Sequence, residues 1–329
     1  MADATLDYVV KAFTWRITAS TAPWDFEQVL ATCETYDDWC RAWCAWGARH
    51  EAFGDAAATP QSAGDAYVRA ALAYHWGAFL FTERQDEFRA AVEAVDRAWA
   101  KAAPHVGMEL LDVDGAPGYL RRPDGARTLV VVLPGVDSTK EEFFGLTTEL
   151  VERGLAVFAV DAHGQGSSSL RRNLEPPFEP VVHAIVDRFA PEFDRIVVGG
   201  LSYGGTFALR AAAQDDRIAA CFAVSSGLTA AGRYEQFHPV TQAGLRHYMG
   251  GDPAEVERAI TVEGLTVDVP VLQVYGGRDA ITPVEDAARV AAELGPTVET
   301  VVLEDGVHVC NNVWYELRPL VANWVAAHA

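Results

Sequence analysis

The spacing of hydrophobic positions changes near residue 104. Before it, apolar side chains recur every three or four residues, which is typical of helices that bury one face. This spacing is clearest in three stretches, at residues 39–46, 64–81 and 85–103. We therefore expect residues 1–104 to form a helical domain, with Pro104 ending its last helix. The many aromatic side chains would form the core of this bundle; a pocket lined by a share of them is the alternative.

After residue 104, short apolar and β-branched runs alternate with helical segments. The expected strands are residues 108–113, 117–121, 128–133, 155–161, 196–200, 218–224, 269–275 and 297–303. Helices are expected at residues 140–153, 206–213 and 312–327. Continuously apolar strands are typical of a sheet covered on both faces, and alternation of strands with helices predicts mostly parallel pairing. Residues 105–329 are therefore predicted to form an α/β domain, a mostly parallel sheet with helices on both faces.

One segment, at about residues 228–265, interrupts this alternation. It is too long to be a single crossover helix. An insertion at the carboxyl ends of parallel strands lies where open α/β sheets bind ligands. We therefore expect this insertion to form part of a lid, with the helices of residues 1–104 supplying the rest.

Charge and length restrict the class of partner. The chain has 329 residues and a formal net charge of −20. Nucleic acids and anionic membranes attract clustered Lys and Arg, so we expect neither as a partner. The N-terminal residues lack the basic and apolar regions of a signal peptide, and no apolar run is long enough to cross a bilayer. We expect a cytoplasmic protein with a small-molecule substrate, and a homodimer stays open.

The cysteines give no sign of a disulfide framework or a metal centre. There are five, an odd number in a long chain, which suits reduced thiols. Cys40 and Cys44 share one face of a predicted helix, but no second ligand pair accompanies them as a structural zinc site would require. We expect no metal and no cofactor.

A Gly-x-Ser-x-Gly motif, Gly200-Leu201-Ser202-Tyr203-Gly204, lies between a predicted strand and a predicted helix. In such a turn the serine is held in a strained conformation, and the two glycines let neighbouring chain pass close by. An incidental glycine turn is the alternative. The strand before the motif and the helix after it favour Ser202 as a nucleophile.

Partners for this serine follow two later strands. A serine hydroxyl needs a base to take its proton, and the base needs a third group to fix its tautomer. Asp279 follows the strand at 269–275, and His308 follows the strand at 297–303. Asp305 is a rival acid, but it lies three residues from His308, so we favour Asp279. The order Ser, Asp, His is that of the α/β-hydrolases.

Chemistry of this kind also needs N–H donors for a developing oxyanion. The N–H of Tyr203, directly after the serine, is one expected donor. The other should come from the loop after the strand at 128–133, where Gly135 permits close approach and Val136 supplies the N–H.

Several segments resemble one bacterial and fungal group of α/β-hydrolases that has an all-helical N-terminal domain. This group includes 2,6-dihydroxypseudooxynicotine hydrolase and fungal polyketide-shortening hydrolases. The matching segments are the loop at residues 133–142, the helix at 62–71, Tyr74-His75, residues 79–81 and the turn at 200–205. The resemblance implies the α/β-hydrolase fold, a helical N-terminal cap and hydrolysis of a carbon–carbon bond next to a ketone.

The resemblance also implies a glutamate in the insertion, near the substrate. Glu235 is the nearest match, and Arg233 or Tyr234 could occupy that place instead. His238 is a further candidate for contact with the substrate. A polar residue here would stabilise the carbanion that leaves when a carbon–carbon bond is cleaved.

The leading hypothesis is a serine hydrolase that cleaves a carbon–carbon bond beside a ketone in an aromatic or polyketide-like substrate of secondary metabolism. A carboxylesterase is one alternative, and a non-hydrolytic cyclase or acyltransferase of a natural-product pathway is another. A catalytically silent binding module is disfavoured because the serine, its partners and the oxyanion loop are all present. Fold analogy alone does not separate hydrolysis from cyclisation.

Overall fold

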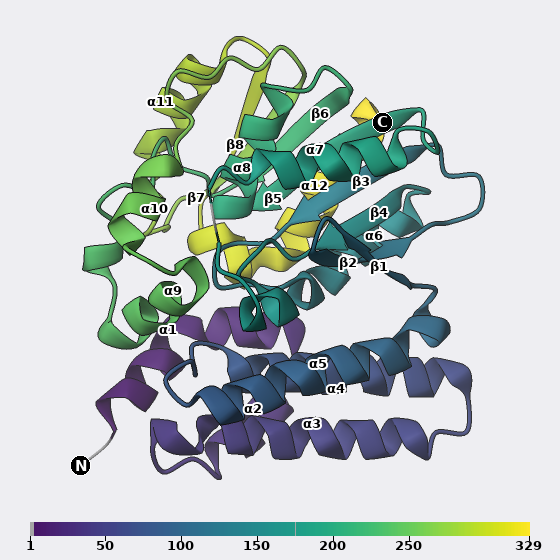
Figure 1. Ribbon diagram of the computed structural model, residues 1–329, viewed down its shortest axis with the longest axis vertical. Coiled ribbons are helices and arrows are strands. Elements are labelled where there is room, and N and C mark those ends of the chain that lie inside the picture. The colour runs from purple at the N-terminus through teal and green to yellow at the C-terminus, as the bar shows by residue number, and fades with distance from the viewer. Residues whose placement is uncertain (1–2, 175) are drawn as a thin grey trace. The chain divides into compact units, whose positions relative to one another are not determined.

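The computed structural model describes residues 3–174 and 176–329. The chain divides into two compact units (Figure 1). The first comprises Met1–Leu110 and His238–Gly244, and the second comprises Leu111–Phe237 and Leu245–Ala329. The N-terminal helices and most of the sheet thus fall into different units.

The first unit is a helical bundle. Its helices are α1 (Ala4–Ser20), α2 (Pro23–Leu30), α3 (Trp39–Asp55), α4 (Pro60–Ala78) and α5 (Gln85–Val106), with a 3₁₀ turn η1 (Tyr36–Asp38) before α3. α4 packs against both α3 and α5. Trp39, Trp43 and Trp76 are fully buried, and the Trp39 Nε1–H donates to the Trp76 carbonyl at 2.7 Å. These indole rings lie in the core of the helical bundle, as the helical spacing of the aromatic residues predicts.

Pro104 does not end α5, contrary to the sequence-based prediction. The helix continues to Val106 and closes at Gly107, whose φ is 66°. The Met108 N–H then donates to the Ala103 carbonyl at 3.0 Å. A proline costs a helix one backbone hydrogen bond and a clash with the carbonyl four residues earlier, but α5 continues through Pro104 for two more residues. A glycine in the left-handed region is what stops the helix here.

The second unit is built around a sheet with strand order β1-β2-β4-β3-β5-β6-β7-β8. The strands are β1 (Glu109–Val113), β2 (Ala116–Arg121), β3 (Thr128–Leu133), β4 (Ala156–Val160), β5 (Arg195–Leu201), β6 (Ile218–Val224), β7 (Val271–Gly276) and β8 (Val298–Leu303). β2 pairs antiparallel with β4, and the pairs from β4 across to β8 are parallel. The prediction of a mostly parallel sheet is confirmed.

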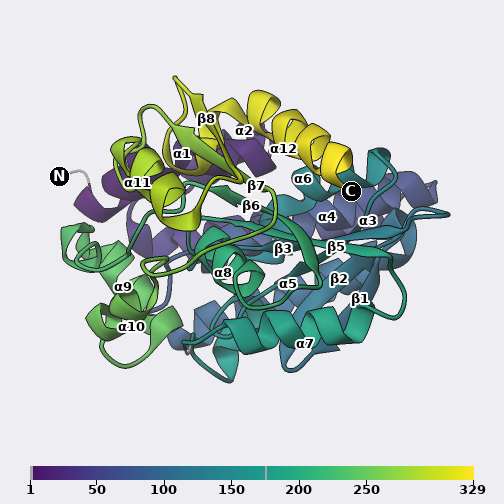
Figure 2. The same cartoon turned by 90° about the horizontal axis from the view of Figure 1, so that it is seen from above.

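Helices cover both faces of this sheet. α6 (Phe144–Glu152) and α12 (Trp314–His328) lie on one face, and α7 (Glu179–Phe189) and α8 (Tyr203–Ala212) lie on the other (Figures 1 and 2). The expected helix at 140–153 begins with a 3₁₀ turn, η2 (Lys140–Phe143). α7 and α11 (Glu285–Leu294) were not predicted; α7 begins at a proline-rich stretch, and α11 buries only small or medium-sized side chains. No helix in the described ranges is long and apolar enough to span a membrane.

The insertion at 228–265 contains three short elements. They are η4 (Tyr234–Gln236), α9 (Pro239–Met249) and α10 (Pro253–Ala259). Backbone bonds close its two ends: Ala230 N–H donates to Ile260, and Val262 N–H donates to Leu228, each at 2.9 Å. The two ends of the insertion therefore lie side by side, and the segment between them leaves the sheet after the carboxyl end of β6. That it acts as a lid stays a prediction.

We expect Leu129→Ala to destabilise the sheet unit strongly. Leu129 lies in β3 and is fully buried, so the truncation leaves a cavity and should cost about 2–5 kcal/mol of unfolding free energy. Leu110→Ala, at a side chain that is 42% exposed, is the matched control and should cost less than about 1 kcal/mol. Urea denaturation followed by circular dichroism measures both. Equal losses would contradict the position of β3 in the core.

Candidate active site

Ser202 occupies a sharp turn between β5 and α8. Its backbone has φ 52° and ψ −122°, a conformation that is strained for any residue with a side chain. A Cβ atom on Gly200 would lie 2.4 Å from the Gly204 carbonyl carbon, and one on Gly204 would lie 2.3 Å from the Leu133 carbonyl oxygen. Both glycines are therefore required by close backbone approach. The turn between them is the strand–turn–helix context of a nucleophile elbow.

Hydrogen bonds to the loop after β6 fix this turn. The Ser202 N–H donates to the Val224 carbonyl, and the Ser226 hydroxyl donates to the Ser202 carbonyl, both at 2.8 Å. The Gly205 N–H also bonds the Ser202 carbonyl, at 3.0 Å. The backbone of Ser202 is thus held from both sides, which is what a strained conformation needs in order to persist.

His308 bridges Ser202 and Asp279. Its Nε2 lies 3.1 Å from the Ser202 Oγ, and its Nδ1 lies 2.9 Å from the Asp279 Oδ2 and 3.1 Å from the Oδ1. The three groups follow β5, β7 and β8, whose carboxyl ends meet at one edge of the sheet. The structure therefore brings together the serine, histidine and aspartate singled out in the sequence. A proton on Nδ1 facing the carboxylate leaves Nε2 free to accept the serine proton.

The surroundings of Asp279 keep it ionised. Its side chain is fully buried, and burial alone would raise the pKa of the carboxyl. His308 and the hydrogen bonds outweigh burial and lower this pKa below its ordinary value. The Oδ1 accepts the N–H groups of Ile281 and Thr282, each at 2.8 Å. Asp279 is thus a fixed negative charge beside the imidazole.

Ser225 is a residue of this site that the sequence analysis missed. It is buried, lies just past β6 and has φ 51°. Its hydroxyl accepts the Val309 N–H at 3.0 Å and also lowers the pKa of Asp279 by hydrogen bonding to the carboxylate. Val309, next to His308, has φ 49°, which is unusual for a β-branched residue. Ser225 therefore ties the aspartate to the strained loop that carries the histidine.

Asp305, the rival acid, lies elsewhere. Its side chain is 69% exposed and pairs with Arg278 at 2.5 Å. Its carbonyl accepts the Asn312 side-chain amide at 2.8 Å. These contacts support the turn before His308, whereas Asp279 is the carboxylate on the imidazole.

The loop after β3 lies beside Ser202. A Cβ atom on Gly135 would lie 3.4 Å from the Ser202 Cβ and 4.0 Å from its Oγ. Val136 is buried, and the N–H of Tyr203 begins α8, where the first N–H groups have no partner inside the helix. The loop and the helix end therefore lie close to the hydroxyl, and the oxyanion roles of Val136 and Tyr203 stay predictions.

Gln165 holds this loop in place. The buried side chain donates its amide N–H to the Gly135 carbonyl and accepts the Ala162 N–H at 2.7 Å. The sequence analysis had not assigned a role to Gln165. Because it bonds the residue next to Val136, it sets the orientation of the peptide that carries the expected oxyanion donor.

A buried ion cluster supports the far end of the same loop. The Lys140 Nζ lies 2.7 Å from both the Asp161 Oδ2 and the Glu141 Oε1, and its backbone N–H donates to the Asp161 Oδ1 at 2.7 Å. All three residues are buried. Burial raises the pKa of Asp161 to about 7, against the attraction of Lys140. The cluster connects the end of β4 to the start of η2, so it positions the segment after the expected oxyanion donors.

The insertion candidates occupy different places. Glu235 is exposed in η4, and the Tyr234 hydroxyl accepts from the Arg246 guanidinium at 2.6 Å. His238 belongs to the first unit, where it stacks on Tyr8 with ring centroids 3.9 Å apart. Their contacts with a substrate stay predictions.

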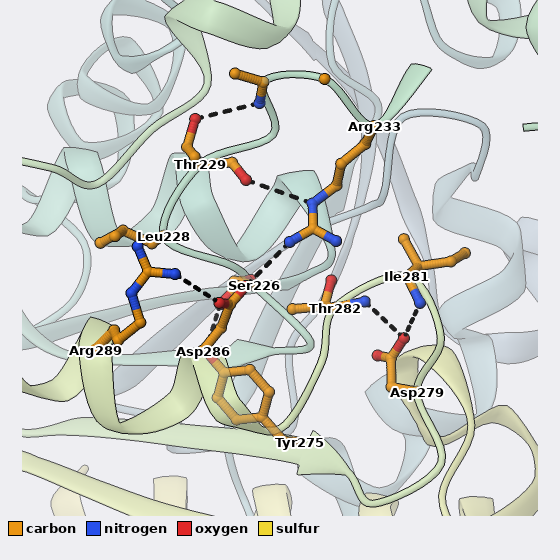
Figure 3. Close-up of polar contacts among 12 residues, drawn as sticks. Ser226, Leu228, Thr229, Arg233, Tyr275, Asp279, Ile281, Thr282, Asp286 and Arg289 are labelled. Carbon is orange, nitrogen blue, oxygen red and sulfur yellow. Dashed lines mark hydrogen bonds and ion pairs between the residues drawn. The ribbon is translucent and has the colours of Figure 1, made fainter. Parts of the chain in front are cut away.

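Two other insertion residues reach the edge of the sheet that carries Ser202. Glu257, fully buried on α10, accepts the Tyr203 hydroxyl at 3.2 Å. Arg233 pairs with Asp286 at 3.0 Å, close to the loop of Asp279 (Figure 3). Neither contact could be read from local spacing, because both join residues more than fifty positions apart.

No metal centre emerges from the part of the chain that is described. Within it, no group of three His, Cys, Asp or Glu side chains is arranged to hold an ion. Cys40 and Cys44 lie with their sulfur atoms 3.8 Å apart on α3.

Known proteins show similarity over most of the chain. Residues 124–251 match a family model described as serine aminopeptidase, S33. A 2,6-dihydropseudooxynicotine hydrolase from Paenarthrobacter nicotinovorans is 31% identical over 283 residues, which cover 80% of this chain and 76% of the relative. The α/β hydrolase gkaG from Penicillium citrinum is 29% identical, covering 61% of this chain and 54% of its own length. The chain thus spans about half the length of this fungal relative.

Solved structures share the fold. The crystal structure of 2,6-dihydroxy-pseudo-oxynicotine hydrolase superposes with a TM-score of 0.82 at 25% identity, covering 95% of both chains. The structure of AbyA5 gives a TM-score of 0.78 at 20% identity, covering 97% of this chain and 94% of the other, which speaks for the fold alone.

Ser202→Ala should abolish labelling by a fluorophosphonate, because the hydroxyl that His308 activates is then missing. The wild-type chain should gain one adduct on the peptide that contains Ser202. Mass spectrometry of the digest locates the adduct, and the melting temperature checks the fold. Ser62→Ala, at an exposed serine of α4, is the control, and it should keep the label. Labelling of the Ser202→Ala chain at another serine would contradict this assignment.

Asp279→Asn should lower kcat by about 10⁴-fold, because an amide stabilises the wrong imidazole tautomer and no longer balances its charge. Asp305→Asn, at the exposed carboxylate, should leave kcat within about 3-fold, as surface changes usually do. Steady-state kinetics on the same substrate compares the two variants. A larger loss from Asp305→Asn would reverse the assignment of the acid.

Proposed function

Because the chain belongs to the α/β-hydrolases related to 2,6-dihydropseudooxynicotine hydrolase, we propose that it is a serine hydrolase that cleaves a carbon–carbon bond beside a ketone. The expected substrate is a bulky aromatic or polyketide-like ketone. One observation carries the proposal: the Ser202 hydroxyl lies 3.1 Å from the Nε2 of His308, and the Nδ1 of His308 lies 2.9 Å from Asp279. That chain of contacts activates a hydroxyl for attack on a carbonyl carbon.

The first half of the reaction forms an acyl-enzyme. His308 takes the Ser202 proton as the oxygen attacks one carbonyl of a β-diketone, and the oxyanion is held by the N–H groups of Val136 and Tyr203. Collapse of this intermediate breaks the bond to the central carbon. The electron pair moves onto that carbon and its neighbouring carbonyl as an enolate, which takes the proton from His308 and leaves as a methyl ketone.

The second half consumes one water. His308 takes a proton from the water, whose oxygen attacks the acyl carbon bound to Ser202. The Ser202 oxygen leaves with that proton, and a carboxylic acid is released. Ketone and acid together equal the diketone plus one water, so the sum of the steps is a hydrolysis.

The leaving group distinguishes this reaction from ester cleavage. An alkoxide takes its proton directly, whereas a carbanion leaves only if the substrate delocalises its charge. The substrate must therefore be a β-diketone, a hydroxylated aromatic ketone or a similar electron sink. Exclusion of water by an aromatic-rich lid would protect the enolate until it is protonated.

A carboxylesterase is the second candidate, because the same hydrogen-bonded chain cleaves esters without any electron sink. A cyclase or acyltransferase of a natural-product pathway is also compatible with this site. The products separate the three activities. Hydrolysis adds a water, cyclisation leaves the mass unchanged, and acyl transfer moves the acyl group to an acceptor other than water.

We expect the purified chain to cleave 1-phenyl-1,3-butanedione with a higher kcat/KM than it shows for p-nitrophenyl acetate. Chromatography with mass detection should find benzoic acid and acetone, and both should be absent with Ser202→Ala. Fast turnover of the ester without cleavage of the diketone would support the esterase. Products of unchanged total mass would support the cyclase.

A further inference from the structure

We propose that Arg233 is a specificity-determining residue that binds a carboxylate on the leaving-group side of the substrate. The preferred substrate would then be a 2,4-dioxo acid rather than a neutral diketone. This inference rests on the proposed function, because it concerns the substrate of the same site.

Arg233 is a half-buried cation fixed at the start of the insertion. Its side chain is 21% exposed. The Nη2 donates to the Asp286 Oδ2 at 3.0 Å, and the Nε donates to the Thr229 carbonyl at 3.4 Å (Figure 3). A guanidinium has five N–H donors, and these two bonds use two of them. The Nη1 points away from Asp286 in Figure 3 and bonds none of the residues drawn there.

The loop after β6, which contains Gly227, lies between Arg233 and the turn of Ser202. A Cβ atom on Gly227 would lie 3.2 Å from the Arg233 Nη2 and 3.4 Å from the Thr282 Cγ2. On one side, Gly227 follows Ser226, whose hydroxyl bonds the Ser202 carbonyl. On the other side, the Thr282 N–H bonds the Asp279 carboxylate. The guanidinium therefore lies next to the loop after β6, which bonds the Ser202 carbonyl, and next to the loop that carries Asp279.

The positive charge of Arg233 is not cancelled by its partner alone. Asp286 also accepts from the Arg289 Nη1 at 3.3 Å, so two guanidinium groups share one carboxylate. Arg289 is 63% exposed and solvated, whereas Arg233 is not. The buried Glu257 also lies nearby, where its carboxylate accepts the Arg233 backbone N–H.

The field of Arg233 reaches the residue next to the nucleophile. Burial and the Glu257 carboxylate raise the pKa of Tyr203 well above its ordinary value, and Arg233 acts in the opposite direction with a smaller effect. The same holds for Tyr275, whose hydroxyl bonds the Ser226 carbonyl at 2.5 Å. Both effects place the guanidinium near the side chains of Tyr203, the residue after Ser202, and of Tyr275. A carboxylate beyond the scissile bond would meet a cation there, and a guanidinium suits carboxylate geometry.

The alternative to a substrate-binding role is that Arg233 has a structural role only. In that account, the pair of Arg233 and Asp286 only fastens the insertion to α11, and either partner is as important as the other. The two accounts differ for Asp286→Asn. If the pair only fixes the insertion to α11, Asp286→Asn should disrupt the site as much as loss of Arg233 does. If Arg233 binds the substrate carboxylate, Asp286→Asn keeps the cation and removes a carboxylate that competes for it.

The test measures binding in the Ser202→Ala background, where no bond is cleaved. The probes are 4-phenyl-2,4-dioxobutanoate, which carries a carboxylate, and 1-phenyl-1,3-butanedione, which has a methyl group in its place. Isothermal titration calorimetry measures the Kd of each probe for the Ser202→Ala chain without a further change, and for the same chain with Arg233→Met, Arg233→Lys or Asp286→Asn. The melting temperature of each variant shows whether it folds. If Arg233→Met does not fold, the two separate variants Arg233→Lys and Asp286→Asn are compared with the chain that keeps Arg233 and Asp286.

We expect Arg233→Met to raise Kd for the carboxylate probe roughly 10- to 100-fold, the usual value of a charge-assisted hydrogen bond, and to leave Kd for the neutral probe within about 3-fold. Arg233→Lys should retain part of the preference, and Asp286→Asn should keep or strengthen it. Equal loss for both probes, loss of the preference in Asp286→Asn, or no binding of the carboxylate probe to the Ser202→Ala chain would overturn the inference. Binding with this pattern but no turnover by the wild-type chain would count against the proposed reaction alone.

Discussion

The backbone conformation of Ser202 constrains the whole site. A side chain at φ 52° is tolerated because Gly200 and Gly204 allow the backbones of β5, α8 and the oxyanion loop to touch, and because Ser226 bonds the serine carbonyl. Ser225 and Val309, also at positive φ, lie in the loops that meet this turn. Strain of this kind persists only where neighbouring contacts over-determine it. The contacts that maintain the strain are the same ones that align the serine with the histidine.

The loop after β3, which carries the expected oxyanion donor Val136, depends on buried polar groups in a similar way. Gln165 fixes the Gly135 carbonyl, and Lys140 bonds Asp161 and Glu141 where water is excluded. Burying charges costs desolvation free energy, so such clusters add little to stability compared with apolar packing. Their effect here is geometric. They hold a loop without regular structure at a set distance from the hydroxyl, which preorganised stabilisation of an oxyanion requires.

The sheet and the hydrogen-bonded group of Ser202, His308 and Asp279 could be predicted because their signals are local. β3 and β6 are almost wholly apolar runs and match the predicted bounds. Ser202 and Asp279 follow the buried strands β5 and β7, whereas His308 follows β8, which carries Glu299 and Thr300 and is only partly buried. Other features depend on distant contacts. Pro104 was misread because the end of α5 is set by Gly107, and Ser225 gains its role from Val309, 84 residues away. The same holds for Arg233, since no pattern near it indicates Asp286.

The measurement that tests the account most directly follows a single turnover of 1-phenyl-1,3-butanedione by rapid quench. If Ser202 is the nucleophile of a carbon–carbon hydrolase, acetone should be released first, together with an equal amount of benzoyl adduct on the peptide that contains Ser202. Benzoic acid should then appear as the adduct decays. Acetone and benzoic acid that appear together, with Ser202 unmodified at every time point, would contradict the account.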